Sequence, residues 1–238
     1  MKCAIMQPYF FPHIGYFSLI KHTEKFILLD TVQYIYHGWI ARNRILKPGE
    51  GWQYFIVPLR AHSRGTIIND IRINDNYKWK DKIVAQMQHY KKSAPFFDNV
   101  INLVNRIFSG SYESISQLNL AALEMVLDYL QIDRKPEVFS DMGISIERPE
   151  NPDEWALNIC CSLGGVTEYW NPPGGKVFFD SSKYERAGIK LLFHEVEQIQ
   201  YSQRRESFEQ GLSILDVLFF NSIDETHKLL DCFRLSQS

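Results

Sequence analysis

The order of the first predicted segments constrains the fold more than any other feature of the chain. Residues 2–6 form a short apolar run typical of a buried strand, and residues 25–30, KFILLD, form a second that ends in a carboxylate. Between them, Pro8 and Pro12 predict a rigid loop, and residues 14–21 carry apolar side chains at helical spacing. Two strands joined through a helix predict parallel neighbours in an α/β sheet.

The remainder of the chain predicts further strands around a long helical stretch. Additional strands are expected at residues 52–59, 136–140, 166–170 and 189–196, with an edge strand or hairpin at 66–74. Helices are expected in the stretch of about 77–132, with Ser114 as an N-cap, and again at 153–163, 181–188, 213–221 and 224–233. We therefore predict a single α/β domain over residues 1–238. Its expected core is a central, mostly parallel sheet of nucleotidyltransferase (Rossmann-like) type, with a helical insertion and C-terminal helices.

Charge and cysteine usage narrow the partners and the compartment. The chain has 26 basic and 28 acidic side chains, a net charge of −2, so no general attraction to nucleic acid is expected. No apolar run approaches the ~20 residues of a membrane-spanning helix, and no signal segment is recognised. The four cysteines fit neither a zinc site nor a disulfide scaffold, which favours free thiols in the cytoplasm. The histidines show no metal-ligand spacing, so no metal site is predicted.

The first candidate site is the loop QPYFFPHIGYF at the end of the first predicted strand. Ligands of open α/β sheets bind beyond the carboxyl ends of the strands, and a helix N-terminus there suits a phosphate. His13 can add a hydrogen-bond donor or a charge, and Gly15 allows close approach of a ligand to the backbone. The predicted nucleotide-binding residues of this loop are Gln7, Pro8, Tyr9, His13 and Gly15. The alternative is an aromatic plug in which His13 only caps the helix.

The second candidate site follows the second predicted strand. Asp30 stands at the strand end, where active-site carboxylates collect, and Arg42 and Arg44 are suited to phosphate or carboxylate. His13, Asp30 and Arg42 are the predicted catalytic residues. The residues of this segment predicted to bind substrate are Gln33, Tyr34, Trp39, Arg42, Asn43 and Arg44. The alternative is a solvated basic loop in which Trp39 covers the core.

The third candidate site is the segment EYWNPPGGK. Asn171 and the pair Gly174–Gly175 predict a tight turn whose backbone can contact substrate, and Lys176 can meet a phosphate. A proline–glycine hairpin without a ligand is the alternative.

Nearly the whole chain resembles the WbqC-like protein family. The likeness is carried by QPYFFPHIGYF, LLDTVQY and WIARNRI, and later by YWNPPGGKVFFD, GIKLLF and LSILDVLFFN. The family is associated with biosynthesis of bacterial surface polysaccharides such as O-antigen, so the resemblance implies a role in that process.

The amino-terminal segment also resembles, more weakly, the HxGH nucleotidyltransferases, which include pantothenate synthetase. The tetrad at the helix start reads His13-Ile14-Gly15-Tyr16, with tyrosine in place of the second histidine. The resemblance implies ATP with Mg²⁺ as cofactor. It also implies that His13 stabilises charge on the α-phosphate during adenylyl transfer, while Tyr16 offers a hydroxyl to the nucleotide.

These features together predict an enzyme that makes precursors of bacterial surface polysaccharide. The expected reaction is aminoacyl transfer, for example of glycine, or ATP-dependent amide formation, on a nucleotide-linked amino sugar. The expected partners are therefore that sugar nucleotide and an amino acid. Two alternatives are a glycosyltransferase that uses a nucleotide sugar, although no D-x-D motif is present, and a non-catalytic sugar-nucleotide-binding or assembly protein.

Overall fold

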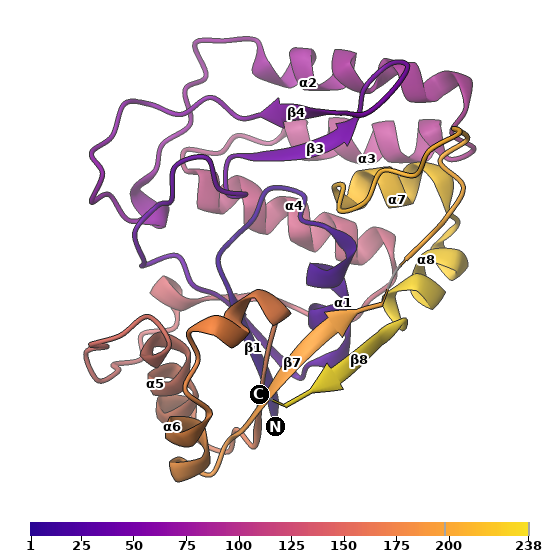
Figure 1. Cartoon of the computed structure of the whole chain (residues 1–238). Coiled ribbons are helices and arrows are strands. Elements are labelled where there is room, and N and C mark those ends of the chain that lie inside the picture. Colours follow the sequence, from indigo (N-terminus) through magenta and orange to yellow (C-terminus); the bar gives the residue numbers. More distant parts are fainter. Residues whose placement is uncertain (198, 238) are drawn as a thin grey trace.

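A six-stranded sheet forms the centre of the computed structural model, which describes residues 1–197 and 199–237 (Figure 1). Its strands are β1 (Lys2–Met6), β2 (Lys25–Leu28), β5 (Glu137–Val138), β6 (Glu168–Asn171), β7 (Lys190–Val196) and β8 (Phe233–Ser236). They lie in the order β5-β2-β1-β6-β7-β8, and all pairs are parallel except β7 with β8. This is the strand order of a doubly wound Rossmann-like sheet, so the predicted α/β class is confirmed.

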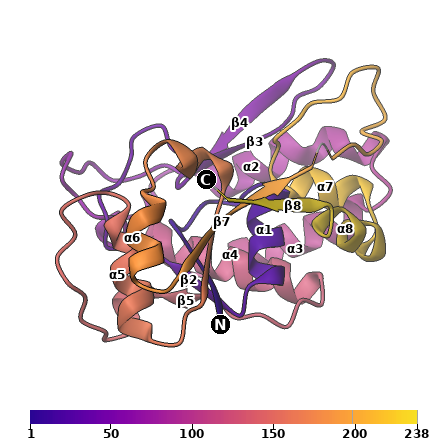
Figure 2. The ribbon, with the colours of Figure 1, turned by 60° about the horizontal axis from the view of Figure 1, so that its bottom comes forward.

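The central strands carry apolar side chains on both faces because helices cover both faces of the sheet. Cys3 and Ile5 of β1 pack into one core, whereas Ala4 packs into the other, as the alternation of side chains along a strand requires. The first face is covered by α5 (Glu154–Leu163) and α6 (Ser181–Arg186), which lie together on one side of the sheet (Figure 2).

The second face carries the larger core. Its helices are α1 (Ile14–His22), α2 (Trp79–Met87), α3 (Phe97–Ser109), α4 (Ile115–Tyr129), α7 (Ile214–Phe220) and α8 (Ile223–Leu230). Short 3₁₀ turns accompany them at η1 (Ile68–Asp70), η2 (Gln88–Lys92), η3 (Phe139–Asp141) and η4 (Pro173–Val177). Ser114 caps α4 through a capping box with Gln117, which confirms the predicted helix start.

Two predicted strands differ in the structure. The strand expected at 52–59 is β4 (Trp52–Ile56), and it pairs with β3 (Arg42–Leu46) in a separate antiparallel hairpin rather than joining the main sheet. The prediction of an edge strand at 66–74 was wrong, because this segment holds η1 and makes only isolated bridges such as Leu59 with Ile73. Strand β8 was not predicted. Within the described residues, no helix has the length and apolar character needed to cross a membrane.

Candidate functional site

The candidate site lies where the direction of the strand order changes, between β1 and β6. Gln7 follows β1, His13 begins α1, and Asn171 ends β6. In open α/β sheets, ligands bind in the crevice at this position. Three hollows lie at this end of the sheet: the arginine pocket, the acidic cleft and the aromatic cleft.

His13 has a fixed protonation pattern. Its Nδ1 accepts a hydrogen bond of 3.1 Å from the backbone N–H of Gly15, which confirms the alternative that this residue caps α1. A neutral imidazole with an accepting Nδ1 carries its proton on Nε2. Although the side chain is exposed to the hollows beside it, the protein packed around the ring lowers the pKa of His13, and the nearby Arg44 lowers it further. The neutral ring therefore presents Nε2–H as a donor.

Little room exists around the His13 cap. A Cβ atom on Gly15 would lie 2.7 Å from His13 Cε1 and 2.8 Å from Val196 Cγ2, so only glycine fits this position as it stands. The N–H of Tyr16 bonds to the carbonyl of His13 at 3.0 Å, so the amides of residues 15 and 16 are both already paired. The donor that α1 presents to a ligand is accordingly the His13 side chain.

The loop that precedes His13 is held by side chains from distant parts of the chain. Asn43 donates to the carbonyls of Phe10 and Phe11, at 3.0 and 2.8 Å. Ser213 also donates to the Phe11 carbonyl, at 2.8 Å. These bonds fix Phe11 at a φ of 42°, in the left-handed region that non-glycine residues rarely adopt. Phe10 and Phe11 are both buried, as the alternative interpretation of an aromatic plug expects.

The arginine pocket, of about 300 Å³, is lined by Tyr9, Pro12, His13, Trp39, Asn43, Arg44 and Gly211. Arg44 projects from β3 and lies near the rings of Trp39 and Trp52, with its Cζ 5.2 and 4.9 Å from their centroids. It donates one hydrogen bond to the carbonyl of Gly211, and its Nε has no partner among the described residues. The pocket thus brings together Arg44 and His13, two side chains with N–H donors, which suits an anionic group.

The acidic cleft, of about 470 Å³, shares His13 and Gly211 with the arginine pocket. Its carboxylates are Glu195, Glu197 and Glu209, from the end of β7 and the segment after it. Glu195 is paired with Arg234 at 3.0 Å, whereas Glu197 and Glu209 have no ion-pair partner in the described part of the chain. His13 thus lines two hollows that differ in charge: the arginine pocket contains Arg44, and the acidic cleft contains Glu195, Glu197 and Glu209, the last with its Oε1 near Gly51 and Lys47.

The aromatic cleft is the largest of these three hollows, at about 1340 Å³, and lies beyond the ends of β1 and β2. Its lining includes Gln7, Thr31, the segment 33–37, His62, Trp155 and Phe178. Here Tyr36 stacks on His62 with centroids 4.8 Å apart and planes 4° from parallel. Gln33 donates to the carbonyl of Arg64 at 2.6 Å, and Tyr34 packs edge-on against both stacked rings.

Several predicted site residues lie away from these hollows. Asp30 is buried and accepts hydrogen bonds from the N–H and the hydroxyl of Ser140, at 3.1 and 2.7 Å, while burial raises its pKa. Tyr16 is buried and donates to the carbonyl of Gln7 at 2.8 Å. Arg42 donates to the carbonyl of His37 and lies 4.2 Å from the ring centroid of Tyr54. The three predicted catalytic residues are therefore not brought together.

The NPPGGK segment forms the turn η4 rather than a hairpin. Asn171 accepts a 3.0 Å hydrogen bond from Tyr169, and Gly175 is buried against Asn171 and Phe179. Gly174 and Lys176 are exposed and line none of the three hollows, although Pro172 and Pro173 line the acidic cleft.

Sequence reasoning missed part of the lining. The missed residues include Thr31, Tyr36, His37, His62, Trp155, Phe178, Glu197 and Glu209. Thr31 and Glu197 carried a usable signal, because each directly follows the carboxyl end of a predicted strand. Among the residues that the structure describes, no group of three histidine, cysteine or acidic side chains is arranged to hold a metal ion.

The sheet order and the ligand-sized hollows at its switch point define a Rossmann-like α/β protein with a binding crevice. Over residues 7–228 the chain matches the WbqC-like protein family, and it belongs to that family, as predicted. It is also similar to the uncharacterized protein Rv1507c of Mycobacterium tuberculosis, with 27% identity over 222 residues that cover 92% of this chain and 93% of that protein. No solved structure was found to match it significantly.

Proposed function

We propose that this protein forms an amide on the amine of a nucleotide-linked amino sugar, as a step in the biosynthesis of bacterial surface polysaccharide. Membership of the WbqC-like family supports the polysaccharide context. The observation that carries the specific proposal is the difference in charge between the two hollows that share His13. Arg44 lines one of them, and the other is lined by Glu197 and Glu209, which have no ion-pair partner among the described residues. An amino sugar linked to a nucleotide has the matching order, an anionic diphosphate beside an amine.

The arginine pocket is the proposed diphosphate site. A guanidinium binds phosphate oxygens through several N–H donors, and Trp39 and Trp52 keep that of Arg44 in place. His13 adds one neutral N–H donor, and the exposed edge of the pocket leaves the phosphates a route to solvent. A fixed donor of this kind stabilises charge without a proton being moved at His13.

The acidic cleft is the proposed site of the amine. Glu197 and Glu209 attract an ammonium group, and either carboxylate can accept the proton that the amine must lose before it reacts. The amine nitrogen then attacks the carbonyl carbon of an activated amino acid, forming the C–N bond as the leaving group departs. We propose an aminoacyl adenylate as that activated acid. Its formation from ATP and the amino acid releases pyrophosphate, and amide formation releases AMP.

The test uses purified full-length protein with ATP, Mg²⁺, an amino acid such as glycine, and nucleotide-linked sugars with and without an amine. We expect pyrophosphate release and a sugar nucleotide heavier by one aminoacyl group, only with the amino sugar. Replacing His13 by Ala or Arg44 by Gln should lower kcat/KM by roughly 100-fold. The double variant Glu197→Gln/Glu209→Gln should fail similarly.

Two matched controls are available. His89 lines none of the three hollows, and Glu185 is exposed on α6, so His89→Ala and Glu185→Gln should keep full activity. Release of a nucleoside diphosphate without amide formation would instead identify a glycosyltransferase. Saturable binding with no product under any condition would identify a non-catalytic binding protein, and either result would overturn the proposal.

A further inference from the structure

The aromatic cleft is separate from the charged groups around His13, yet the chain connects the two places directly. Gln7 and His37 line the aromatic cleft, and Tyr9 and Trp39, two residues further along in each case, line the arginine pocket. Two residues span at most about 7 Å of extended chain. A single ligand can therefore pass from one hollow to the other along both of these segments.

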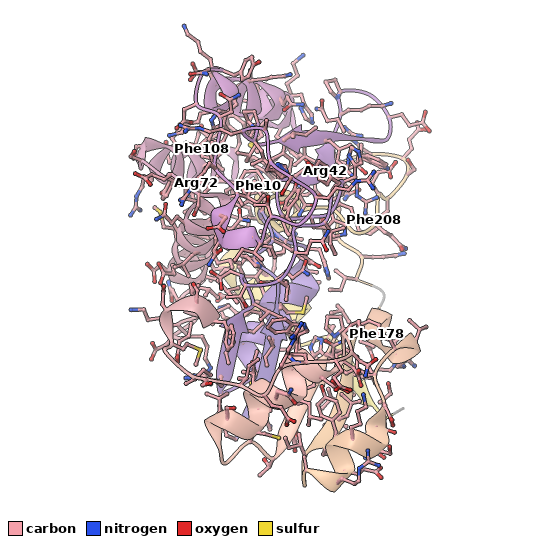
Figure 3. All side chains as sticks on the ribbon, turned by 90° about the vertical axis from the view of Figure 1, so that its left-hand side faces the viewer. Phe10, Arg42, Arg72, Phe108, Phe178 and Phe208 are labelled. Atoms are coloured by element: carbon pink, nitrogen blue, oxygen red, sulfur yellow. The ribbon has the colours of Figure 1, made fainter. Side chains whose placement is uncertain are left out.

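The chemistry of the aromatic cleft differs from that of its neighbours. Its main surfaces are flat rings: the stacked pair Tyr36 and His62, Trp155 of α5, and Phe178, which directly follows η4. Tyr36 is 49% exposed and Phe178 is 51% exposed, so ring surface is open to a ligand. Phe178 lies at the edge of the lower part of the molecule, facing the part that carries Arg42 (Figure 3).

Hydrogen-bonding groups accompany these rings. Thr31 Oγ1 and His62 Nε2 are shut off from solvent and have no partner among the described residues. A buried polar atom without a partner is destabilising, so each is a group that a ligand or a bound water would satisfy. Thr31 stands one position after Asp30, whose carboxylate is already occupied by Ser140. Thr31 is thus the first free polar side chain beyond the end of β2.

We infer that the aromatic cleft binds the nucleoside of the substrate, with the base stacked against Tyr36 and Phe178 and its edge or the ribose hydrogen-bonded by Thr31 and Gln7. The inference rests on the proposed function for the rest of the ligand. Flat aromatic surfaces stack with any base, and the position beyond β1 and β2 belongs to the crevice in which sheets of this order bind nucleotides. The three hollows then accept nucleoside, diphosphate and amino sugar in that order.

The experiment measures binding by calorimetry for a panel of nucleoside diphosphates, inorganic pyrophosphate and a neutral oligosaccharide. At least one nucleoside diphosphate should bind tenfold or more tightly than pyrophosphate, because stacking of a base adds affinity. Tyr36→Ala and Phe178→Ala should each weaken that nucleotide by roughly tenfold to a hundredfold and leave pyrophosphate affinity unchanged.

The conservative variant Tyr36→Phe keeps the ring face and should stay within about threefold of the parent affinity. Thermal unfolding of each variant identifies any that lose affinity through misfolding. Equal affinity for nucleotide and pyrophosphate would overturn the inference, as would an unchanged affinity in both alanine variants or displacement of the nucleotide by the oligosaccharide.

Failure of this inference can be told apart from failure of the proposed function. If nucleotide binding depends on Tyr36 but no amide forms and Arg44→Gln has no effect, the nucleoside site stands and the proposed reaction falls. If the amide forms but Tyr36→Ala leaves kcat/KM for the sugar nucleotide unchanged, the reaction stands and the nucleoside site falls.

Discussion

His194 is a buried histidine whose hydrogen bonds define its state. Ser18 donates its only hydroxyl proton to the carbonyl of Leu230, at 2.6 Å, so the 2.9 Å contact between Ser18 Oγ and His194 Nε2 requires Nε2 to be the donor. The ring also stacks on Phe233, with centroids 4.4 Å apart. A neutral histidine with Nε2–H satisfies all of these contacts.

This residue makes the folded state sensitive to acid. Burial, with smaller contributions from the nearby His22 and His13, lowers the pKa of His194 to about 4. Between pH 6.5 and pH 4 the unfolded chain, in which this histidine has an ordinary pKa, binds more protons than the folded chain. The contribution of His194 to the free energy of unfolding is therefore fully present above about pH 6.5 and decreases as the pH falls toward 4. The free energy of unfolding should decrease by about 2 kcal/mol between pH 7.5 and pH 5 on account of His194.

Urea unfolding at both pH values measures this loss. His194→Gln keeps a donor for Ser18 but does not titrate, so its loss should be smaller than that of the parent by the same amount. His37→Gln, at an exposed position, is the matched control and should behave like the parent. An unchanged pH dependence in His194→Gln would show that other groups cause the acid sensitivity.

At the scale of elements, strand β3 fixes the loop that carries the candidate site. Asn43 sits between the two arginines of β3 and points the opposite way, into the core, where its amide donates to Phe10 and Phe11. Asn119 of α4 does the same for the carbonyls of Pro8 and Ile40, at 2.8 and 2.9 Å. The hairpin and α4 therefore position the loop from two sides.

Asn43→Asp should destabilise the protein by about 2 kcal/mol or more, because a carboxylate cannot donate and would face two carbonyl oxygens. The side-chain volume hardly changes, so the effect reports the loss of the two hydrogen bonds together with the burial of a charge, and not a packing defect. Urea unfolding measures it, and Asn105→Asp at an exposed position of α3 should change stability little. Similar losses in both variants would contradict a bracing role for Asn43.

The sequence predicted elements well where the signal is local. The strand, loop, helix and strand at the amino terminus appear as expected, because apolar runs and prolines specify them directly. The pairing of β4 with β3 could not be read in the same way, since an apolar run does not state which strand lies beside it. The structural role of Asp30 could not be predicted either, because Ser140, which donates hydrogen bonds to its carboxylate, lies 110 residues away.

At the scale of the whole molecule, Asp216 joins three parts of the chain in one buried junction. Its carboxylate accepts hydrogen bonds from Tyr90 of η2, at 2.6 Å, and from Tyr201 and Gln203 of the segment after β7, at 2.5 and 2.8 Å. Burial raises the pKa of Asp216. The junction fixes the segment that supplies Glu209 and Gly211 to the hollows around His13.

Tyr201→Phe should increase local unfolding of the segment after β7 without unfolding the rest of the protein. Loss of its hydrogen bond to Asp216 should cost about 1–3 kcal/mol, and amide hydrogen exchange should accelerate in residues 199–212. Tyr90→Phe removes the bond from η2 to Asp216 and also the acceptor of the Leu46 N–H, so it should lower global stability without a selective effect on residues 199–212. The same exchange pattern in both variants would contradict the local role of Tyr201.

This arrangement also explains why the charge order of the site escaped prediction. His13 and Arg44 belong to segments that the sequence analysis predicted as candidate sites. Glu209 lies near them because the buried Asp216 junction holds its segment against β3. No pattern in the local sequence predicts this position of Glu209.

The tight fit at Gly15 offers a way to separate the presence of the imidazole from its alignment. A methyl group at this position would push the His13 ring away from the Gly15 N–H that orients it, while the imidazole itself stays present. Gly15→Ala would thus misdirect the His13 proton without deleting it, a distinction that truncation of the histidine itself can never make.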